Sequence, residues 1–199
     1  ETFVNIEATP SSITPEIGKV LARYNTDRVT LGIQSVDEDL LSTMNRPQSF
    51  EEISTAVSVL RDSGVAYINF DLVGGLTKDT VDNFVPNFRN LLTLKPEMVH
   101  VYPYSEKPGF PASAEKSEII GTAKNILREL GYSSIKNDGW GLNEQSSNCS
   151  LVGLKMKSVP IIPTRTVAIG PFHGMFEINR AAEAPTPAQV SEIFSPSLC

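Results

Sequence analysis

The stretch RVTLGIQSVDEDLLSTMNRPQSFEEISTAVSVLRDSGVAYINFDLVGGL, residues 28–76, decides the fold. Its first part, residues 28–35, is an apolar run typical of a strand and contains Gln34 near its end. Residues 49–64 begin with a capping box, carry one apolar face and end in glycine, so they predict a helix. Residues 66–76 are apolar on both faces apart from one asparagine and one aspartate, a pattern typical of a parallel strand covered on both sides. The stretch therefore predicts two parallel strands joined by helices.

The same alternation extends in both directions. Residues 2–8 and 98–105 predict two further strands, and a helix is expected after each strand. In the helix after the third strand, Pro86 should produce a kink or an early end. Four strand-helix units in series predict an α/β fold with a parallel sheet and right-handed crossovers. An open doubly wound sheet, a closed barrel and a partial barrel are all compatible with this periodicity.

The pattern changes after Tyr132. Residues 133–142 are compatible with a fifth strand, and residues 164–179 predict a strand, a turn and a strand. The remaining residues predict a loop with at most one short helix. We therefore expect two regions, a strand-helix region over 1–132 and a small α+β extension over 133–199.

Composition limits the classes of function. The net charge of -6 gives no general attraction to nucleic acid, and we expect no nucleic-acid or membrane partner. Cys149 and Cys199 form neither a metal motif nor a disulfide framework, and no signal peptide is recognisable, so we expect a cytoplasmic protein. Because the sequence starts without methionine, directly in a predicted strand, we also expect it to be part of a longer protein.

Polar side chains stand near the C-terminal ends of the predicted strands: Glu7, Gln34, Asp71 and Tyr104. In barrels and in open parallel sheets, ligands bind at this edge. Gly74 and Gly75 would let a ligand approach the backbone, and Arg46 could hold a carboxylate with both of its terminal nitrogens. Together these residues suit a ligand that has an amino acid end and a pair of sugar hydroxyls.

Each of these residues also has a simpler interpretation. Asp71 alone would usually be a structural ion-pair partner, and Gln34 alone would be a strand-end cap. The glycine pair alone is an ordinary loop, and Arg46 alone is a solvated surface charge. The recurrence of polar residues at equivalent places in consecutive units favours a binding site, although spacing alone leaves both interpretations open.

The segments VNIEATP, LGIQSVDEDLLSTMNR, INFDLVGGL and VHVYPYSEKPG, in this order, resemble the radical S-adenosylmethionine enzymes of the oxygen-independent coproporphyrinogen III oxidase-like family. The resemblance covers about residues 2–132. It implies that the chain supplies the last four strand-helix units, strands 3–6, of a partial (β/α)6 TIM-like barrel. The first two strands would then lie upstream, in a part of the protein that the sequence does not include.

The resemblance also implies roles for particular residues. The position of Glu7 contacts the methionine part of S-adenosylmethionine in the family. The positions of Gln34, Arg46 and Asp71 contact bound S-adenosylmethionine, and Ser105 matches another ligand-contacting position. The turn AIGPFH resembles the family's glycine-rich turn, which makes His173 a candidate contact, although a packed or exposed histidine is the simpler interpretation.

The sequence departs from the family in one important respect. The family binds a [4Fe-4S] cluster through a C-x-x-x-C-x-x-C motif, which is absent from these 199 residues. We therefore expect the cluster ligands upstream and no catalytic activity from this fragment alone. The catalytic residues cannot be named from the sequence.

The resemblance implies an enzyme that generates a 5′-deoxyadenosyl radical to abstract hydrogen from an organic substrate, or to methylate it, with a flavodoxin or ferredoxin as electron donor. A first alternative is the anaerobic oxidative decarboxylation of coproporphyrinogen III, against which the few basic residues after Tyr132 count slightly. A second is a non-catalytic haem-trafficking protein or interaction module. Haem trafficking ranks last, because the expected His-Asn segment is replaced by NDGWGLNEQSSNCS.

Overall fold

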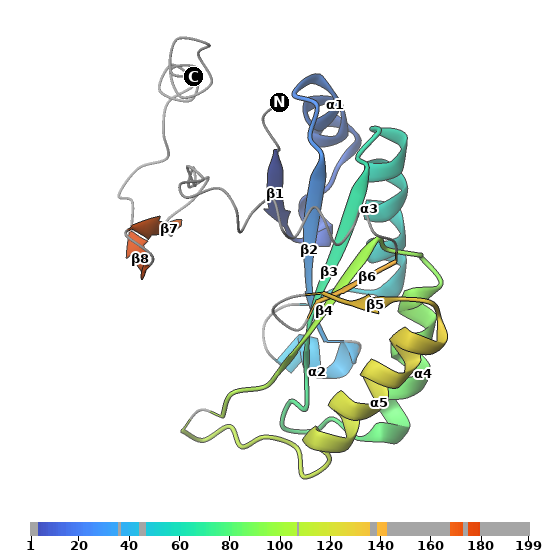
Figure 1. Ribbon diagram of the computed structural model, residues 1–199, viewed down its shortest axis with the longest axis vertical. Helices are drawn as coiled ribbons and strands as arrows, with labels where there is room; N and C mark the ends of the chain where they lie inside the picture. The colour runs from blue at the N-terminus through green and yellow to red at the C-terminus, as the bar shows by residue number, and fades with distance from the viewer. Residues whose placement is uncertain are drawn as a thin grey trace. The chain divides into compact units, whose positions relative to one another are not determined.

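The computed structural model describes residues 4–35, 37–43, 47–106, 108–135, 139–142, 168–172 and 175–179. The chain divides into two compact units, Glu1–Ser150 and Leu151–Cys199 (Figure 1). The first unit extends past the boundary at residue 132 that the sequence suggested. The reason is that two short strands after Tyr132 join its sheet.

The sheet of the first unit has the order β1-β2-β3-β4-β6-β5. Its four parallel strands are β1 (Asn5–Ala8), β2 (Arg28–Gln34), β3 (Tyr67–Gly74) and β4 (Met98–Pro103). Strand β6 (Gly139–Gly141) pairs antiparallel with β4, and β5 (Ser133–Ser134) pairs with β6. The expected fifth strand is therefore a pair of short strands.

The helices pack against one face of this sheet. They are α1 (Pro15–Arg23), α3 (Phe50–Asp62), α4 (Val81–Leu92) and α5 (Lys116–Glu129), with η1 (Pro10–Ser12) and the short α2 (Glu38–Thr43) in the connections. Figure 1 shows α3, α4 and α5 together on one side of the strands. On β2 and β3 the fully buried apolar residues alternate along the strand: Val29, Leu31, Ile33, Ile68, Phe70 and Leu72. Because every second residue of these strands is fully buried, one face of the sheet packs on the helices.

Strand order distinguishes the architectures that periodicity left open. A doubly wound sheet reverses its strand order at a switch point, whereas β1 to β4 follow one another in chain order. Parallel strands in chain order, with their helices on one face, are the arrangement of a (β/α) barrel wall. The predicted partial barrel is confirmed. The prediction that residues 66–76 are covered on both faces is wrong in one respect, because in the described part of the chain helices cover only one face of β3.

Local sequence signals account for the helix boundaries. Thr14 caps α1 by accepting a hydrogen bond from the Ile17 N–H at 3.3 Å. The predicted capping box of α3 is present, with Glu52 N–H to Ser49 Oγ at 3.2 Å and Ser49 N–H to Glu52 Oε2 at 2.8 Å. Gly64 follows α3 with a φ of 78°.

Helix α4 continues through Pro86 to Leu92, so the expected early end at the proline is wrong. Pro86 is exposed, and the buried residues Phe84 and Phe88, whose rings stack with centroids 5.2 Å apart, hold the helix on the core. The carbonyl that lacks a proline N–H partner belongs to Asp82, which is also exposed, so water can satisfy it.

The second unit contains an antiparallel pair, β7 (Ala168–Phe172) and β8 (Met175–Asn179), which confirms the two predicted strands; the turn between them lies outside the described residues. The short helix suggested near the end of the chain lies outside the described residues. Among the helices of the described ranges, none combines the length and the apolar content that crossing a bilayer requires.

Candidate functional site

The face of the sheet opposite the helices carries polar side chains, and we call it the polar face. Strand register arranges it in rows. One row joins Glu7, Thr30, Asn69 and Met98, and the next joins Gly32, Asp71, His100 and Gly139. Because the strands are parallel, the second row lies nearer the C-terminal ends of β2 and β3. Ligands bind beyond that edge in parallel sheets.

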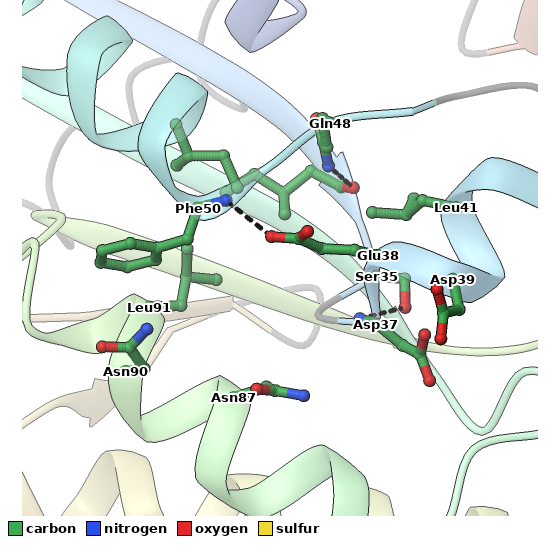
Figure 2. Close-up of a pocket in the computed structure, with 12 residues that line it drawn as sticks. Ser35, Asp37, Glu38, Asp39, Leu41, Gln48, Phe50, Asn87, Asn90 and Leu91 are labelled. Carbon is green, nitrogen blue, oxygen red and sulfur yellow. Dashed lines mark hydrogen bonds between the residues drawn. The ribbon is translucent and has the colours of Figure 1, made fainter.

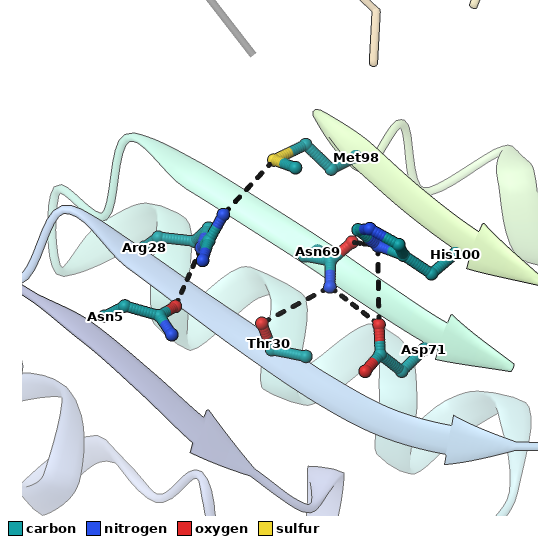
Figure 3. Close-up of polar contacts among 7 residues, drawn as sticks. All are labelled: Asn5, Arg28, Thr30, Asn69, Asp71, Met98 and His100. Atoms are coloured by element: carbon teal, nitrogen blue, oxygen red, sulfur yellow. Dashed lines mark hydrogen bonds and ion pairs between the residues drawn. The ribbon is translucent and has the colours of Figure 1, made fainter. Parts of the chain in front are cut away.

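A hydrogen-bonded network connects three strands of the polar face (Figure 3). The Asn69 amide nitrogen donates to Asp71 Oδ1 at 2.8 Å and to Thr30 Oγ1 at 3.3 Å. His100 Nδ1 lies 2.9 Å from Asn69 Oδ1 and 3.6 Å from Asp71 Oδ1. The network therefore holds one oxygen of the Asp71 carboxylate in a fixed place.

Asp71 lies between core and solvent, with 28% of its side chain exposed. Burial raises the pKa of Asp71 above the ordinary aspartate value, and the Asn69 hydrogen bond and the Arg28 charge oppose this rise. Arg28 itself donates from Nε to Asn5 Oδ1 at 2.8 Å, near the N-terminal end of β2. Asp71 is thus a desolvated acceptor, and within the described residues the basic side chain within 4 Å of it is the His100 imidazole, not an arginine.

Gln34 reaches the same row through an irregularity in β2. The pairing with β3 shifts between Gly32 and Gln34, and Gln34 has a φ of 69°, a left-handed conformation that costs a non-glycine residue about 1–2 kcal/mol. A Cβ on Gly32 would lie 3.0 Å from Gln34 Nε2, so the amide covers the polar side of Gly32. Since Gly32 pairs with Asp71, the amide and the carboxylate occupy neighbouring strands on one face.

The other predicted site residues fall into three groups. Glu7 is exposed and alternates with Ile6 and Ala8, which pack on the core, so Glu7 belongs to the polar face. Ser105 is exposed in the segment after β4, and no described contact joins it to Asp71. Arg46 and His173 lie outside the described residues.

Tyr104 does not join the polar network. Its hydroxyl donates to the Phe110 carbonyl at 3.2 Å, and its N–H bonds to the Gly74 carbonyl at 3.0 Å. The ring is therefore tied to the loop between β4 and α5. The backbone bond to β3 shows that residue 104 serves to extend the strand pairing.

The expectation that Gly74 and Gly75 admit a ligand is not what the structure shows. A Cβ on Gly74 would meet Ile120 at 2.8 Å, and one on Gly75 would meet the side chain of Lys116. The Gly75 N–H is already used, because it donates to Asp79 Oδ2 at 3.0 Å. Close packing against α5 is therefore a physical reason for both glycines, and Gly75 also has a φ of 84°.

Reasoning from strand ends missed Thr30, Asn69 and His100. The signal that could have found them is the alternation of polar residues along consecutive strands, with Arg28, Thr30 and Gln34 on β2 and with Asn69 and Asp71 on β3. A strand covered on both faces has no reason to repeat polar residues at every second position.

A separate pocket of about 450 Å³ lies between the end of β2 and helices α2, α3 and α4 (Figure 2). Acidic and amide side chains line it, among them Asp37, Glu38 and Gln48. Glu38 Oε1 accepts from the Phe50 N–H at 3.1 Å, and Gln48 donates to the Ile33 carbonyl. Of the predicted site residues that the structure describes, none lines this pocket.

The resemblance implies two bound groups, S-adenosylmethionine and a [4Fe-4S] cluster, and the residues present fit only the first. The polar face offers a fixed carboxylate and an amide, which suit the hydroxyls and the charged end of S-adenosylmethionine. A [4Fe-4S] cluster finds no ligands here. In the ranges that the structure describes, no group of three or more histidine, cysteine or acidic side chains could hold a metal ion. The sequence contains only two cysteines, 50 positions apart.

Comparison with known proteins shows which families this chain is similar to. Residues 1–85 match the family described as the radical SAM superfamily. The chain is 30% identical over 155 residues to the oxygen-independent coproporphyrinogen III oxidase of Bradyrhizobium diazoefficiens, covering 72% of this chain and 34% of that protein. Its identity to the Helicobacter pylori protein of the same name is 27% over 147 residues, covering 68% of this chain and 32% of that protein.

A solved structure, that of coproporphyrinogen III oxidase from Escherichia coli, shares the fold. It has a TM-score of 0.65 and 24% identity, covering 70% of this chain and 35% of that chain. The chain thus spans about a third of the length of the proteins it matches. On these matches and this fold, the chain belongs to the radical SAM superfamily and to its coproporphyrinogen III oxidase-like family.

Proposed function

We propose that the chain forms the S-adenosylmethionine-binding wall of a radical enzyme that abstracts hydrogen from an organic substrate. The observation that carries this proposal is the fixed Asp71 carboxylate beside the Gln34 amide, on a polar barrel face near the C-terminal ends of parallel strands. Together, bound S-adenosylmethionine and a reduced [4Fe-4S] cluster supply a carbon radical able to remove hydrogen.

In this proposal the chain's residues bind and orient. Asp71 accepts hydrogen bonds from the ribose hydroxyls through the carboxylate oxygen that the network leaves available. Gln34 donates to or accepts from the ligand with its amide, and Glu7 attracts the ammonium of the methionine part. Arg46 would hold the ligand's carboxylate. The cluster ligands would come from outside these 199 residues, because the sequence lacks a set of three cysteines.

The substrate belongs to the same proposal. The coproporphyrinogen III oxidases among the relatives make oxidative decarboxylation the second candidate reaction. That substrate carries several carboxylates. Among the residues of β1 to β4, Arg28 is the one lysine or arginine, and it lies near the N-terminal end of β2. This placement favours a less acidic substrate. Methyl transfer is a further outcome, recognised by formation of S-adenosylhomocysteine.

The reaction also requires a source of electrons, and we propose a flavodoxin or a ferredoxin in the cytoplasm. Haem trafficking would instead give a protein that binds haem and releases no nucleoside product. An absorbance titration with haem separates this alternative from the enzyme.

The test is an assay for 5′-deoxyadenosine. The complete protein is reconstituted anaerobically with iron and sulfide, reduced and mixed with S-adenosylmethionine. We expect 5′-deoxyadenosine from the wild type and much less from Asp71→Ala. Circular dichroism spectra should show that both proteins are folded. No 5′-deoxyadenosine from a reduced, iron-loaded wild type would overturn the proposal.

A further inference from the structure

The two oxygens of Asp71 have different surroundings. Oδ1 accepts the Asn69 hydrogen bond at 2.8 Å and lies 3.6 Å from His100 Nδ1. Within the described ranges, Oδ2 makes no hydrogen bond. The carboxylate is thus held by one oxygen, which leaves the other for a ligand. The direction in which Oδ2 points therefore depends on the contacts that hold the Asn69 side chain.

Three contacts fix Asn69, which is only 4% exposed. Its nitrogen donates to Asp71 and to Thr30, and its oxygen faces His100 Nδ1 at 2.9 Å. Because the amide oxygen carries no hydrogen, Nδ1 must be the protonated nitrogen and the donor. A reversed amide would turn its oxygen toward the Asp71 carboxylate and lose two donated bonds. The His100 donor therefore selects the amide orientation that supports Asp71.

His100 is held in turn from both sides. Its ring stacks on Tyr102, with centroids 5.7 Å apart and planes 12° apart. On the neighbouring strand, a Cβ at Gly139 would lie 2.5 Å from His100 Nε2, so only glycine leaves room for the ring. With 13% of its side chain exposed, the histidine is largely removed from solvent. Strands β3, β4 and β6 together set the position of Nδ1.

We propose that His100 is a positioning residue for the nucleoside, acting through Asn69 to aim Asp71 Oδ2 at the ribose hydroxyls of S-adenosylmethionine. The inference rests on the proposed function, and it adds two residues, Asn69 and His100, that do not themselves contact the ligand. A carboxylate aimed at a ribose hydroxyl pair is a recurring means of nucleoside recognition. Misdirection of the carboxylate weakens its hydrogen bonds without removing its charge.

Two substitutions at one position separate the donor from the ring. His100→Phe keeps an aromatic ring beside Tyr102 but removes the Nδ1 donor. His100→Asn loses the ring, while its amide nitrogen can take the place of Nδ1 and donate to Asn69. Affinity for S-adenosylhomocysteine is measured by isothermal titration calorimetry on the complete reconstituted protein, with circular dichroism to confirm the fold. This probe shares the nucleoside and cannot be cleaved to a radical.

We expect His100→Phe to weaken binding about tenfold, the change that loss of one hydrogen bond in a charged network makes. We expect His100→Asn to bind within about threefold of the wild type. In an Asp71→Ala background, His100→Phe should cause no further loss, because the two residues act in series. Wild-type affinity in His100→Phe would overturn the inference.

Two other results would also overturn it. Equal losses in His100→Phe and His100→Asn would assign the histidine to ring packing. A loss from His100→Phe that persists undiminished in the Asp71→Ala background would show that His100 acts by another route. In each of these cases the wild type still binds, so the proposed function stands. A wild type that binds no S-adenosylhomocysteine would instead remove the proposed function and this inference together.

Discussion

At the scale of single residues, the polar face depends on side chains that the strands place in adverse surroundings. Asp71 is a partly buried carboxylate, and Gln34 is held with a φ of 69°. A strained backbone and a desolvated charge both reduce stability, and proteins retain such features mainly where function requires them. The strain at Gln34 and the burial of Asp71 together therefore support a binding role for this part of the polar face.

The strain at Gln34 gives a first prediction. Gln34→Gly relieves a left-handed penalty of about 1–2 kcal/mol and loses up to about 1 kcal/mol through the more flexible unfolded chain. We expect its free energy of unfolding, measured in urea, to equal or exceed that of the wild type, while affinity for S-adenosylhomocysteine falls. Lys95→Gly is the matched control, since Lys95 has a φ of 52° in the segment between α4 and β4, before the N-terminal end of β4. A control that lost equal affinity would refute a specific role for the amide.

The pKa of Asp71 gives a second prediction. Because burial raises this pKa above 3.8, the folded protein binds the proton more tightly than the unfolded chain. The contribution of Asp71 to stability is fully present when the pH is below the pKa of Asp71 in the unfolded chain. It is lost as the pH rises through the pKa of Asp71 in the folded protein. Asp71→Asn escapes this loss, and its amide oxygen can still accept from Asn69.

We therefore expect urea unfolding to show the wild type losing free energy relative to Asp71→Asn as the pH rises above 3.8. Asp62→Asn, at an exposed position at the end of α3, makes the same change in charge and serves as the control. A difference between Asp71→Asn and the wild type that stays constant with pH would mean that burial does not govern this carboxyl.

At the scale of elements, the loop between β3 and α4 shows how the strand ends are kept in place. Asp79 Oδ2 accepts the N–H groups of Gly75 and Leu76 at 3.0 and 2.9 Å, and Ser113 Oγ donates to the Asp79 carbonyl. Burial raises the pKa of Asp79, while the two backbone bonds oppose the rise. The loop is thus a packed structure that ties β3 to α5.

Two glycines with similar backbones test that packing. Gly75 has a φ of 84° and lies against Lys116, whereas Gly64 has a φ of 78° with nothing within 4 Å of an added Cβ. Gly64→Ala should cost about 1–2 kcal/mol of unfolding free energy for the backbone alone. Gly75→Ala should cost about 1–3 kcal/mol more, because the methyl group overlaps α5. Equal costs in urea unfolding would show that Lys116 yields freely.

At the scale of the whole molecule, the sequence predicted the parallel strands and the helices between them, since capping residues and apolar periodicity are local signals. It could not separate a barrel wall from a doubly wound sheet, because right-handed crossovers occur in both and only strand order differs. Asp71, Gln34 and Glu7 were predictable as polar residues near strand ends. Asn69 and His100 were missed because their roles depend on register across strands.

The central claim is that S-adenosylmethionine binds on the polar face, with its ribose at Asp71. The most direct test is a crystal structure of the reconstituted complete protein with S-adenosylhomocysteine. The account predicts ribose hydroxyls within about 3 Å of Asp71 Oδ2 and Gln34 in contact with the ligand. A ligand seated in the pocket between α2, α3 and α4, or elsewhere away from Asp71, would contradict it.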